Sequence, residues 1–233
     1  MANSLKMTRP ERFRQFLAYF TENYPEPRTE LAYRNPYELI VAVVLSAQCT
    51  DKRVNQVMPA LLAQFPTATE LGAATDEDIF PFIRSVSYPN NKAKHLAGLG
   101  HLLMAEFGGE VPSTIEELQR LPGVGRKTAN VVVSVIYNQP AMAVDTHVFR
   151  VSHRLGLVPK TATTPLAVEK ALVKYTPQEF IPKAHHWLIL HGRYICVART
   201  PKCSVCPLTG FCAYYEKVVV GGASEALWQK KLG

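Results

Sequence analysis

A single lysine beside a glycine-rich turn is the first feature of this 233-residue chain that could do chemistry. Lys127 follows Leu121–Gly125, a Leu-Pro-Gly-Val-Gly segment that predicts a tight turn between two helices. The first of these helices has a capping signal at Ser113 with a glutamate three residues on, and the second runs from near Arg126 to about Asn138. The N–H groups that begin the second helix are a site for an anion such as phosphate. The positive helix end also disfavours the ammonium form of Lys127, which leaves its amine available as a nucleophile.

Four of the five cysteines lie close together near the C-terminus and could surround one metal centre. They are Cys196, Cys203, Cys206 and Cys212. Four thiolates suit either zinc or an iron–sulfur cluster. Zinc sites usually contain two tight C-x2-C pairs, whereas only one pair is tight here, so the spacing favours a 4Fe–4S cluster. We expect Cys49, far away in the sequence, to be a buried small hydrophobic residue.

Two cations, Arg199 and Lys202, lie in the loop between the first two of these cysteines. A loop braced by a metal centre could use both to bind a phosphate backbone. They could equally serve to offset the negative charge of the thiolates. The sequence leaves both interpretations open.

Apolar residues recur at helical spacing along the chain, and no segment alternates as a strand would, so we predict an all-α fold. Thr8 is the expected cap of the first helix, and the apolar run Leu39–Leu45 predicts a central core helix. Asp145 begins a helix that Gly156 ends. Breaks at Tyr24–Pro27 and at Pro140 suggest domain limits.

The formal net charge of +7 favours a polyanion as partner, although a basic enzyme without a nucleic-acid role has the same charge. The chain shows no secretory signal and no stretch of membrane-spanning length. We therefore expect no membrane partner and a cytoplasmic protein, associated with the nucleoid in a bacterium. In that reducing compartment the cysteines act as ligands or nucleophiles rather than as disulfides.

The hairpin with Lys127, the segment Ala143–Arg150 and the cysteine spacing together resemble the endonuclease III family of helix-hairpin-helix DNA glycosylases. Leu45–Gln48 and His185–Arg193 match the family as well, so the resemblance extends from about residue 9 to 217. A bare hairpin occurs in many DNA-binding proteins. Its combination with Asp145 and the cysteine loop is specific to this family.

The resemblance implies two helical domains with a DNA-binding groove between them. A six-helix domain over residues 29–139 would hold the helix-hairpin-helix motif at about 113–138. Residues 1–28 would join residues 140–217 in a second domain with the iron–sulfur loop. Residues 218–233 would form a C-terminal tail beyond the family core, and we assign it no function.

The resemblance also implies a base-excision-repair enzyme with two activities. As a glycosylase it would remove oxidised pyrimidines from double-stranded DNA, and as an AP lyase it would cleave 3′ to the abasic site by β-elimination. Lys127 would be the nucleophile that forms a Schiff base, Asp145 the catalytic carboxylate, and the four cysteines the ligands of one 4Fe–4S cluster. We expect it to act as a monomer. The expected DNA contacts are Gln48, Tyr88, Gly123, Val124, Gly125, Arg126, Thr128, Arg199 and Lys202.

One position departs from the family pattern. Relatives usually have an aliphatic wedge in the loop where this chain has Tyr88-Pro89. Tyrosine can also wedge or stack between bases. The preference for a lesion and for the opposite base therefore does not follow from the resemblance.

Two other functions compete with this interpretation. A monofunctional adenine glycosylase of the same superfamily would lack Lys127 and would have a further C-terminal domain, for which too little chain follows Cys212. A non-catalytic iron–sulfur protein that binds DNA or senses redox state would not need Lys127 paired with Asp145. Alone, Lys127 could be a phosphate-binding lysine, Asp145 a helix cap and Gln48 a polar loop residue.

Overall fold

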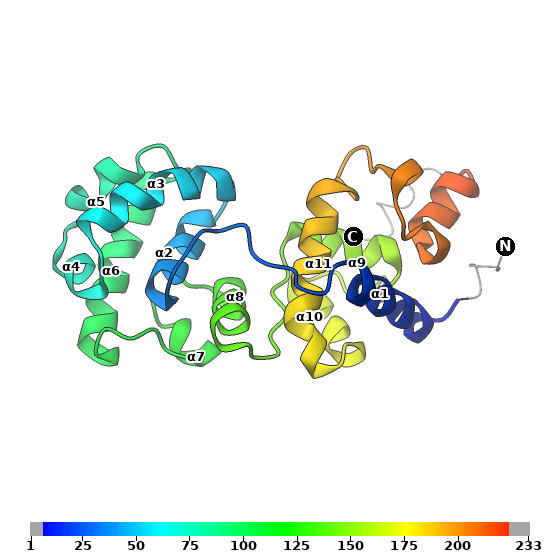
Figure 1. The fold of residues 1–233 in the computed structure, drawn as a ribbon, viewed down its shortest axis with the longest axis horizontal. Helices are drawn as coiled ribbons and strands as arrows, with labels where there is room; N and C mark the ends of the chain where they lie inside the picture. The colour runs from blue at the N-terminus through cyan, green and yellow to red at the C-terminus, as the bar shows by residue number, and fades with distance from the viewer. Residues whose placement is uncertain (1–6, 224–233) are drawn as a thin grey trace. The chain divides into compact units, whose positions relative to one another are not determined.

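The computed structural model describes residues 7–223, which form helices and contain no strand. The all-α prediction is confirmed. The chain divides into two compact units, one over Thr29–Gln139 and one made of the residues up to Arg28 and those from Pro140 onward (Figure 1). Each unit has a buried core of its own.

Seven helices form the unit of residues 29–139, one more than expected. The count includes α7, the predicted helix before the hairpin, which is only a single turn of four residues. The helices are α2 (Pro36–Ser46), α3 (Asp51–Gln64), α4 (Ala68–Ala73), α5 (Asp76–Ile83), α6 (Pro89–Phe107), α7 (Ile115–Leu118) and α8 (Arg126–Tyr137).

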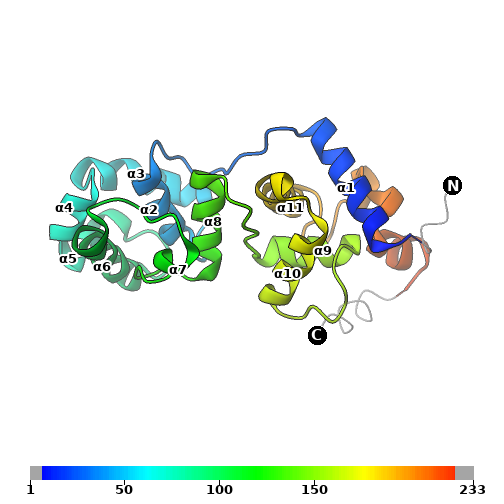
Figure 2. The same ribbon diagram turned by 90° about the horizontal axis from the view of Figure 1, so that it is seen from below.

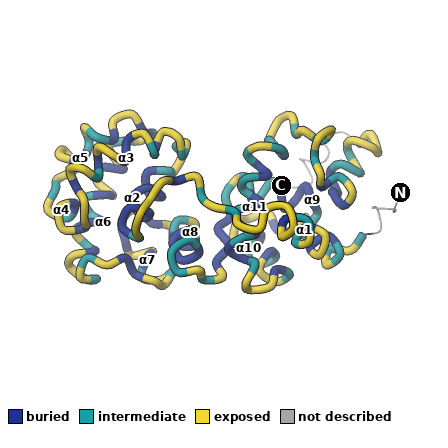
Figure 3. Tube along the Cα trace, viewed as in Figure 1, coloured by how far each residue is buried: buried dark blue, intermediate teal, exposed yellow. Residues whose placement is uncertain are grey.

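The apolar helix α2 is the centre of this unit, as predicted. Every residue from Tyr37 to Leu45 is buried (Figure 3). It contacts α3, α6 and α8, and both ribbon views show α8 beside it (Figures 1 and 2). Asn35 caps its start by accepting a hydrogen bond from the Glu38 amide at 2.9 Å. A helix that is apolar all round is stable only when neighbours cover every face.

The longest helix of the unit, α6, begins at Pro89, directly after Tyr88. Proline is favoured in the first turn because its missing N–H has no partner there in any helix. Glycines let α6 approach α4 closely: a Cβ on Gly100 would lie 2.6 Å from the Gly72 nitrogen. Helix α6 thus forms a firm support behind the hairpin and behind the loop that contains Tyr88.

The other unit packs helices from both ends of the chain together. Aromatic residues of the N-terminal helix meet Trp187, with ring centroids 6.0 Å away for Phe16 and 5.5 Å for Phe20. The Trp187 indole N–H donates to the Tyr24 carbonyl at 2.8 Å. The α-helices are α1 (Arg9–Asn23), which Thr8 caps as predicted, α9 (Thr146–Leu155), α10 (Pro165–Tyr175) and α11 (Ile181–Tyr194).

Short helical segments follow α11 and form the cysteine loop and its continuation. They are the 3₁₀ turns η3 (Cys203–Val205) and η4 (Thr209–Phe211) and the π-helix η5 (Tyr215–Val220). The predicted domain end at residue 217 falls inside η5, so the regular structure continues past it. Within the described range, no helix has the length and apolar character needed to cross a bilayer. Of the predicted tail, residues 218–233, the part from residue 224 onward lies outside the described residues.

Candidate functional site

The hairpin consists of α7, a turn and the start of α8. Its cap is Thr114 rather than Ser113: the Thr114 hydroxyl accepts from the Glu117 amide at 3.3 Å and donates to the Glu117 carboxylate at 2.7 Å. Both pairs have the capping-box spacing, so the pattern alone does not distinguish them. Leu121 and Val124 in the turn are buried, and their side chains anchor the turn in the core.

The two glycines of the turn have different local roles. Gly123 has φ +79°, and a Cβ there would lie 3.0 Å from the Cβ of His95 on α6. A side chain at Gly123 would therefore be strained and crowded. Gly125 has an ordinary φ of −86°, and a Cβ there would meet nothing within 4 Å. The fold requires Gly123, while Gly125 leaves open space in front of the backbone.

Lys127 is exposed in the first turn of α8. Gly125 is the N-cap of this helix, and within residues 7–223 no side chain caps α8 there. The neighbouring Arg126 is exposed and Thr128 is partly buried. The structure thus places the five predicted hairpin contacts beside an accessible amine at a helix N-terminus, where an anion binds favourably.

Asp145 is the N-cap of α9, as predicted. Its Oδ1 accepts from the amides of His147 and Val148, both at 2.8 Å. The carboxylate is partly exposed, and among the described residues no hydrogen bond reaches Oδ2. Lys127 and Asp145 belong to different units, so their joint action remains a prediction.

Gln48 and Tyr88 share an unusual backbone conformation. Both have φ +53°, in the left-handed region, which costs a residue with a Cβ about 1–2 kcal/mol. Both side chains are exposed, and Tyr88 is 61% accessible. The Ser87 hydroxyl donates to the Gln48 carbonyl at 2.6 Å, which joins the two loops. Strained exposed residues of this kind commonly occur at functional sites.

The four predicted ligand cysteines all lie in one hydrophobic core or pack against it. Cys196 and Cys212 are buried, while Cys203 and Cys206 are partly buried. None of the five cysteines forms a disulfide in the described part of the chain. Cys49 is half-buried in a loop, so the prediction that it is a buried core residue was wrong. The turn that follows Ser46 leaves it at the edge of the core rather than inside.

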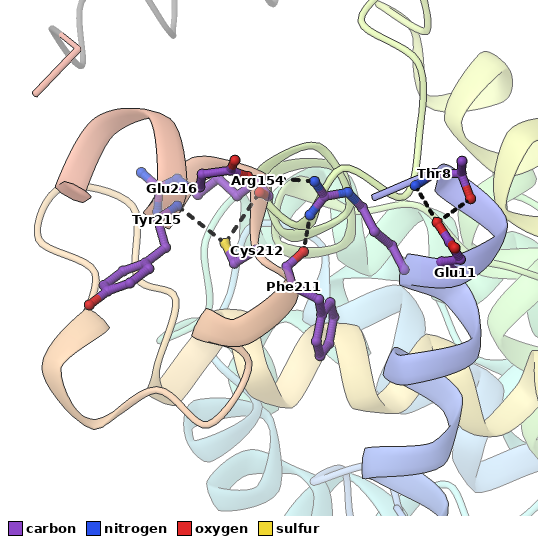
Figure 4. Close-up of polar contacts among 8 residues, drawn as sticks. Thr8, Glu11, Arg154, Phe211, Cys212, Tyr215 and Glu216 are labelled. Carbon is purple, nitrogen blue, oxygen red and sulfur yellow. Dashed lines mark hydrogen bonds and ion pairs between the residues drawn. The ribbon is translucent and has the colours of Figure 1, made fainter. Parts of the chain in front are cut away.

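Polar groups of the chain lie close to two of the sulfurs, and Figure 4 shows those around Cys212. The Tyr215 amide donates to Cys212 Sγ at 3.5 Å, and that sulfur also contacts the Arg154 carbonyl at 3.3 Å. The Arg154 guanidinium lies 3.6 Å from Cys196 Sγ and donates to the carbonyls of Val197 and Ala198 at 2.8 and 2.7 Å. Helix α9 therefore holds the start of the cysteine loop through Arg154.

Arg199 and Lys202 are both exposed on this loop. The Lys202 amide donates to the Ile195 carbonyl at 3.0 Å and closes the loop at its base. Their exposure leaves both side chains accessible to a ligand in solvent.

Comparison with known proteins identifies the family. Residues 41–178 match the HhH-GPD superfamily base excision DNA repair proteins, and residues 196–212 match the iron–sulfur binding domain of endonuclease III. Endonuclease III of Escherichia coli K12 is 44% identical over 207 residues, 88% of this chain and 96% of the relative. The chain belongs to the endonuclease III family. Endonuclease III of Bacillus subtilis is 46% identical over 194 residues, 83% of this chain and 88% of that protein.

Solved structures support the same family. A trapped endonuclease III–DNA covalent intermediate, in an estranged-adenine complex, has a TM-score of 0.85 and 44% identity, with 91% of this chain and all of that chain covered. A non-covalent endonuclease III–DNA complex has a TM-score of 0.85 and 43% identity, with 92% of this chain covered. A thermostable thymine-DNA glycosylase, 22% identical with a TM-score of 0.79, shares the fold. As an endonuclease III family member, the protein is a DNA glycosylase with AP lyase activity.

The family carries a 4Fe–4S cluster, and the cysteine loop fits one. Burial raises the pKa of Cys212 to about 12 and also raises the pKa of Cys206, so both thiols need a nearby cation to ionise. A bound cluster would supply that charge. Within the described residues, no three His, Cys, Asp or Glu side chains are gathered closely enough for a single metal ion. The four thiols are the donors that a 4Fe–4S cluster would bind.

Two residues that were not predicted from the sequence, Lys92 and Arg154, are buried although both are cationic. Burial lowers the pKa of Lys92, and the nearby Cys49 acts in the opposite direction. A signal for Lys92 was present. It lies on the apolar face of α6, four residues before Leu96 and seven before Leu99, where a lysine needs a specific partner.

Proposed function

We propose that this endonuclease III family member removes oxidised pyrimidines from double-stranded DNA and then cleaves the strand 3′ to the abasic site. The observation that carries the proposal is the exposed amine of Lys127 at the uncapped start of α8, within the hairpin. An imine needs a primary amine with access to the sugar, and Lys127 has that access. The exposed Lys127 thus accounts for both activities with one residue.

In the proposed reaction, Lys127 Nζ attacks C1′ of the damaged nucleotide. The bond from C1′ to the base breaks, and the base leaves with its electron pair and takes up a proton. Opening of the sugar ring then gives an imine between Nζ and C1′. Loss of a proton from C2′ breaks the bond from C3′ to oxygen and releases the 3′ phosphate, which is the β-elimination.

Asp145 has the features of the accompanying base. Its Oδ1 is held by two helix amides, which fixes the carboxylate in orientation. Its Oδ2 is available to take the proton that Lys127 must lose, and the negative charge stabilises positive charge on the sugar. In this proposal the cap and the catalytic group are the same carboxylate.

The remaining predicted contacts position the DNA. The backbone around Gly123, Val124 and Gly125, with Arg126 and Thr128, would bind phosphate without reading sequence. Arg199 and Lys202 would bind the backbone at a second place. Gln48 and Tyr88 would enter the space that the extruded base leaves, a step that is cheapest at a damaged base pair.

The cluster would be held by Cys196, Cys203, Cys206 and Cys212. When bound, it supplies four covalent attachments that brace a loop with little secondary structure of its own. A loop attached in this way would hold Arg199 and Lys202 in fixed positions. No proton or bond of the proposed reaction involves the cluster.

We further propose that the protein acts as a monomer in the cytoplasm, and at the nucleoid if its host is a bacterium. The support is chemical: the absence of disulfides among the described residues suits a reducing compartment, and the net charge of +7 suits association with DNA. Sedimentation at micromolar concentration tests the oligomeric state.

A panel of duplexes tests the substrate class. Each duplex contains an oxidised pyrimidine such as thymine glycol, an 8-oxoguanine, or an adenine opposite 8-oxoguanine, and cleavage is measured in single turnover. We expect strand cleavage at the oxidised pyrimidine to be fastest. Base removal only at adenine, without strand cleavage, would favour the monofunctional alternative. Binding without reaction on all three would favour a non-catalytic protein.

A further inference from the structure

Lys92 is a buried cation in a unit whose proposed nucleophile is exposed. Its side chain is on α6, and the residue is 5% accessible. Its Nζ donates to the Leu45 and Ala47 carbonyls, each at 2.7 Å, and to the Ser87 hydroxyl at 3.3 Å. An ammonium group has three protons, so these acceptors use all of them. Lys92 is therefore held in place and is not available as a second nucleophile.

The acceptors of Lys92 lie in two segments of the chain, one just before Gln48 and one just before Tyr88. Leu45 and Ala47 lie at the C-terminal end of α2, where carbonyls lack helical partners and attract a cation. Ser87 immediately precedes Tyr88. The Lys92 side chain thus bridges the segment before Gln48 to the segment before Tyr88.

Hydrogen bonds continue from Lys92 to both left-handed residues. The Ser87 hydroxyl, which accepts from Lys92, donates its one proton to the Gln48 carbonyl at 2.6 Å. The Lys92 backbone amide donates to the Tyr88 carbonyl at 3.1 Å. The bond to Tyr88 belongs to the backbone of α6. The Lys92 side chain reaches the Gln48 carbonyl through one hydroxyl, and it contacts directly the residue before Tyr88.

We propose that Lys92 is a positioning residue for base extrusion, which holds Gln48 and Tyr88 in their left-handed conformations before DNA binds. This inference rests on the proposed function, in which both side chains enter the space of the extruded base. A non-glycine residue leaves the left-handed region readily when nothing holds it there. Preorganised loops avoid the cost of becoming ordered during binding.

Two variants and one control test the proposal. Lys92→Met removes the ammonium and keeps an unbranched side chain of similar length. Ser87→Ala removes only the hydroxyl between Lys92 and Gln48. Lys94→Met is the matched control, because Lys94 is an exposed lysine on the same helix and its loss changes the net charge equally.

Each variant is measured in single turnover on two substrates. One is a duplex with an oxidised pyrimidine, and the other is a single strand with a preformed abasic site, from which no base has to be extruded. We expect Lys92→Met to be slowed about tenfold on the duplex. We expect Ser87→Ala to be slowed less in the same direction. Both variants should keep the wild-type rate on the single strand, and Lys94→Met should match wild type on both substrates.

An equal loss on both substrates would mean a general structural role and would overturn the proposal, as would an unchanged duplex rate. If circular dichroism shows that Lys92→Met does not fold, Ser87→Ala decides alone by the same two rates, because it removes one partly exposed hydroxyl. Failure of the proposed function looks different. In that case the wild-type protein itself leaves both substrates intact, and this inference falls with it.

Discussion

At the scale of single residues, Asp145 combines two roles through its two oxygens. Oδ1 accepts both amide hydrogen bonds that begin α9, at 2.8 Å each. Oδ2 is the oxygen that would take the proton from Lys127. A substitution that keeps an oxygen acceptor and removes the charge therefore separates the helix cap from the proposed base.

Asp145→Asn makes that separation. Asparagine caps helices as well as aspartate does, so the free energy of unfolding should change by less than about 0.5 kcal/mol. The single-turnover rate on an oxidised pyrimidine should fall by about 10²–10⁴-fold, because the amide cannot accept the lysine proton. Urea unfolding and a cleavage assay measure the two effects. The control Asp145→Ala removes the cap too, so its free energy of unfolding should fall by about 1 kcal/mol in addition to the loss of rate. A wild-type rate in Asp145→Asn would mean that Asp145 is only a helix cap.

Single residues were predictable from sequence where a local rule fixes them. Asp145 and Thr8 precede helices and cap them, as short polar residues do. Thr114 was missed because Ser113 has the same spacing to a glutamate. Lys92 was missed because its acceptors lie up to 47 positions earlier in the chain, and no local pattern reports them.

At the scale of elements, the hairpin uses two glycines for different reasons. Gly123 is required by its positive φ and by His95 behind it, whereas Gly125 has an ordinary φ and open space in front. The first glycine serves the fold. The second is explained by a ligand that must approach the backbone closely.

Gly125→Ser tests this distinction. Serine is a good N-cap with an allowed φ here, so thermal stability should stay the same or rise slightly. The added side chain should intrude between the α8 amides and a phosphate, and DNA affinity should fall about tenfold, a loss of roughly 1.4 kcal/mol. Calorimetry and fluorescence anisotropy measure the two quantities. Unchanged affinity would remove Gly125 from the DNA contacts.

The cysteine loop poses a second question at this scale, namely what Arg199 and Lys202 do. Each phosphate contact contributes about 0.9 to the slope of log K against log salt. If both bind DNA backbone, Arg199→Ala and Lys202→Ala should each reduce that slope by about 0.9, with the cluster absorbance unchanged. A slope equal to that of wild type, together with loss of cluster absorbance, would mean that the two cations offset the negative charge of the thiolates instead.

Most helices followed from local signals, and the exceptions have physical causes. The apolar run of α2 and the prolines in the first turns of α10 and α11 are strong patterns. The helix predicted to begin at Ser113 is shorter than expected, and its single turn α7 packs against α8. The π-helix η5 lies beyond the expected end of the domain and is too short for periodicity to be recognised.

At the scale of the whole molecule, the chain forms two units with separate cores, and the cysteine loop belongs to only one of them. The boundaries follow the Tyr24–Pro27 break and precede Pro140. Contacts between distant segments, such as Phe16 and Phe20 with Trp187, could not be read from sequence, since any aromatic residue can pair with any other. The family pattern was therefore needed to join the N-terminal helix to the C-terminal half.

Removal of the cluster should destabilise only the unit that contains the cysteine loop. Chelation under reducing conditions leaves Cys196 and Cys212 without a cation inside the core that α1, α9 and α11 share. Amide hydrogen exchange should then accelerate in these helices and remain slow in α2 and α6. The untreated protein is the control. Equal acceleration in both units would show that the two cores unfold together.

The central claim is that Lys127 attacks the sugar, and borohydride trapping on an abasic duplex tests it most directly. Wild type should form a covalent adduct with the DNA. Lys127→Arg keeps the positive charge for phosphate binding but has no primary amine, so it should bind the duplex and form no adduct. Lys127→Ala should form none either. An adduct from either variant, or none from cluster-loaded wild type, would contradict the account.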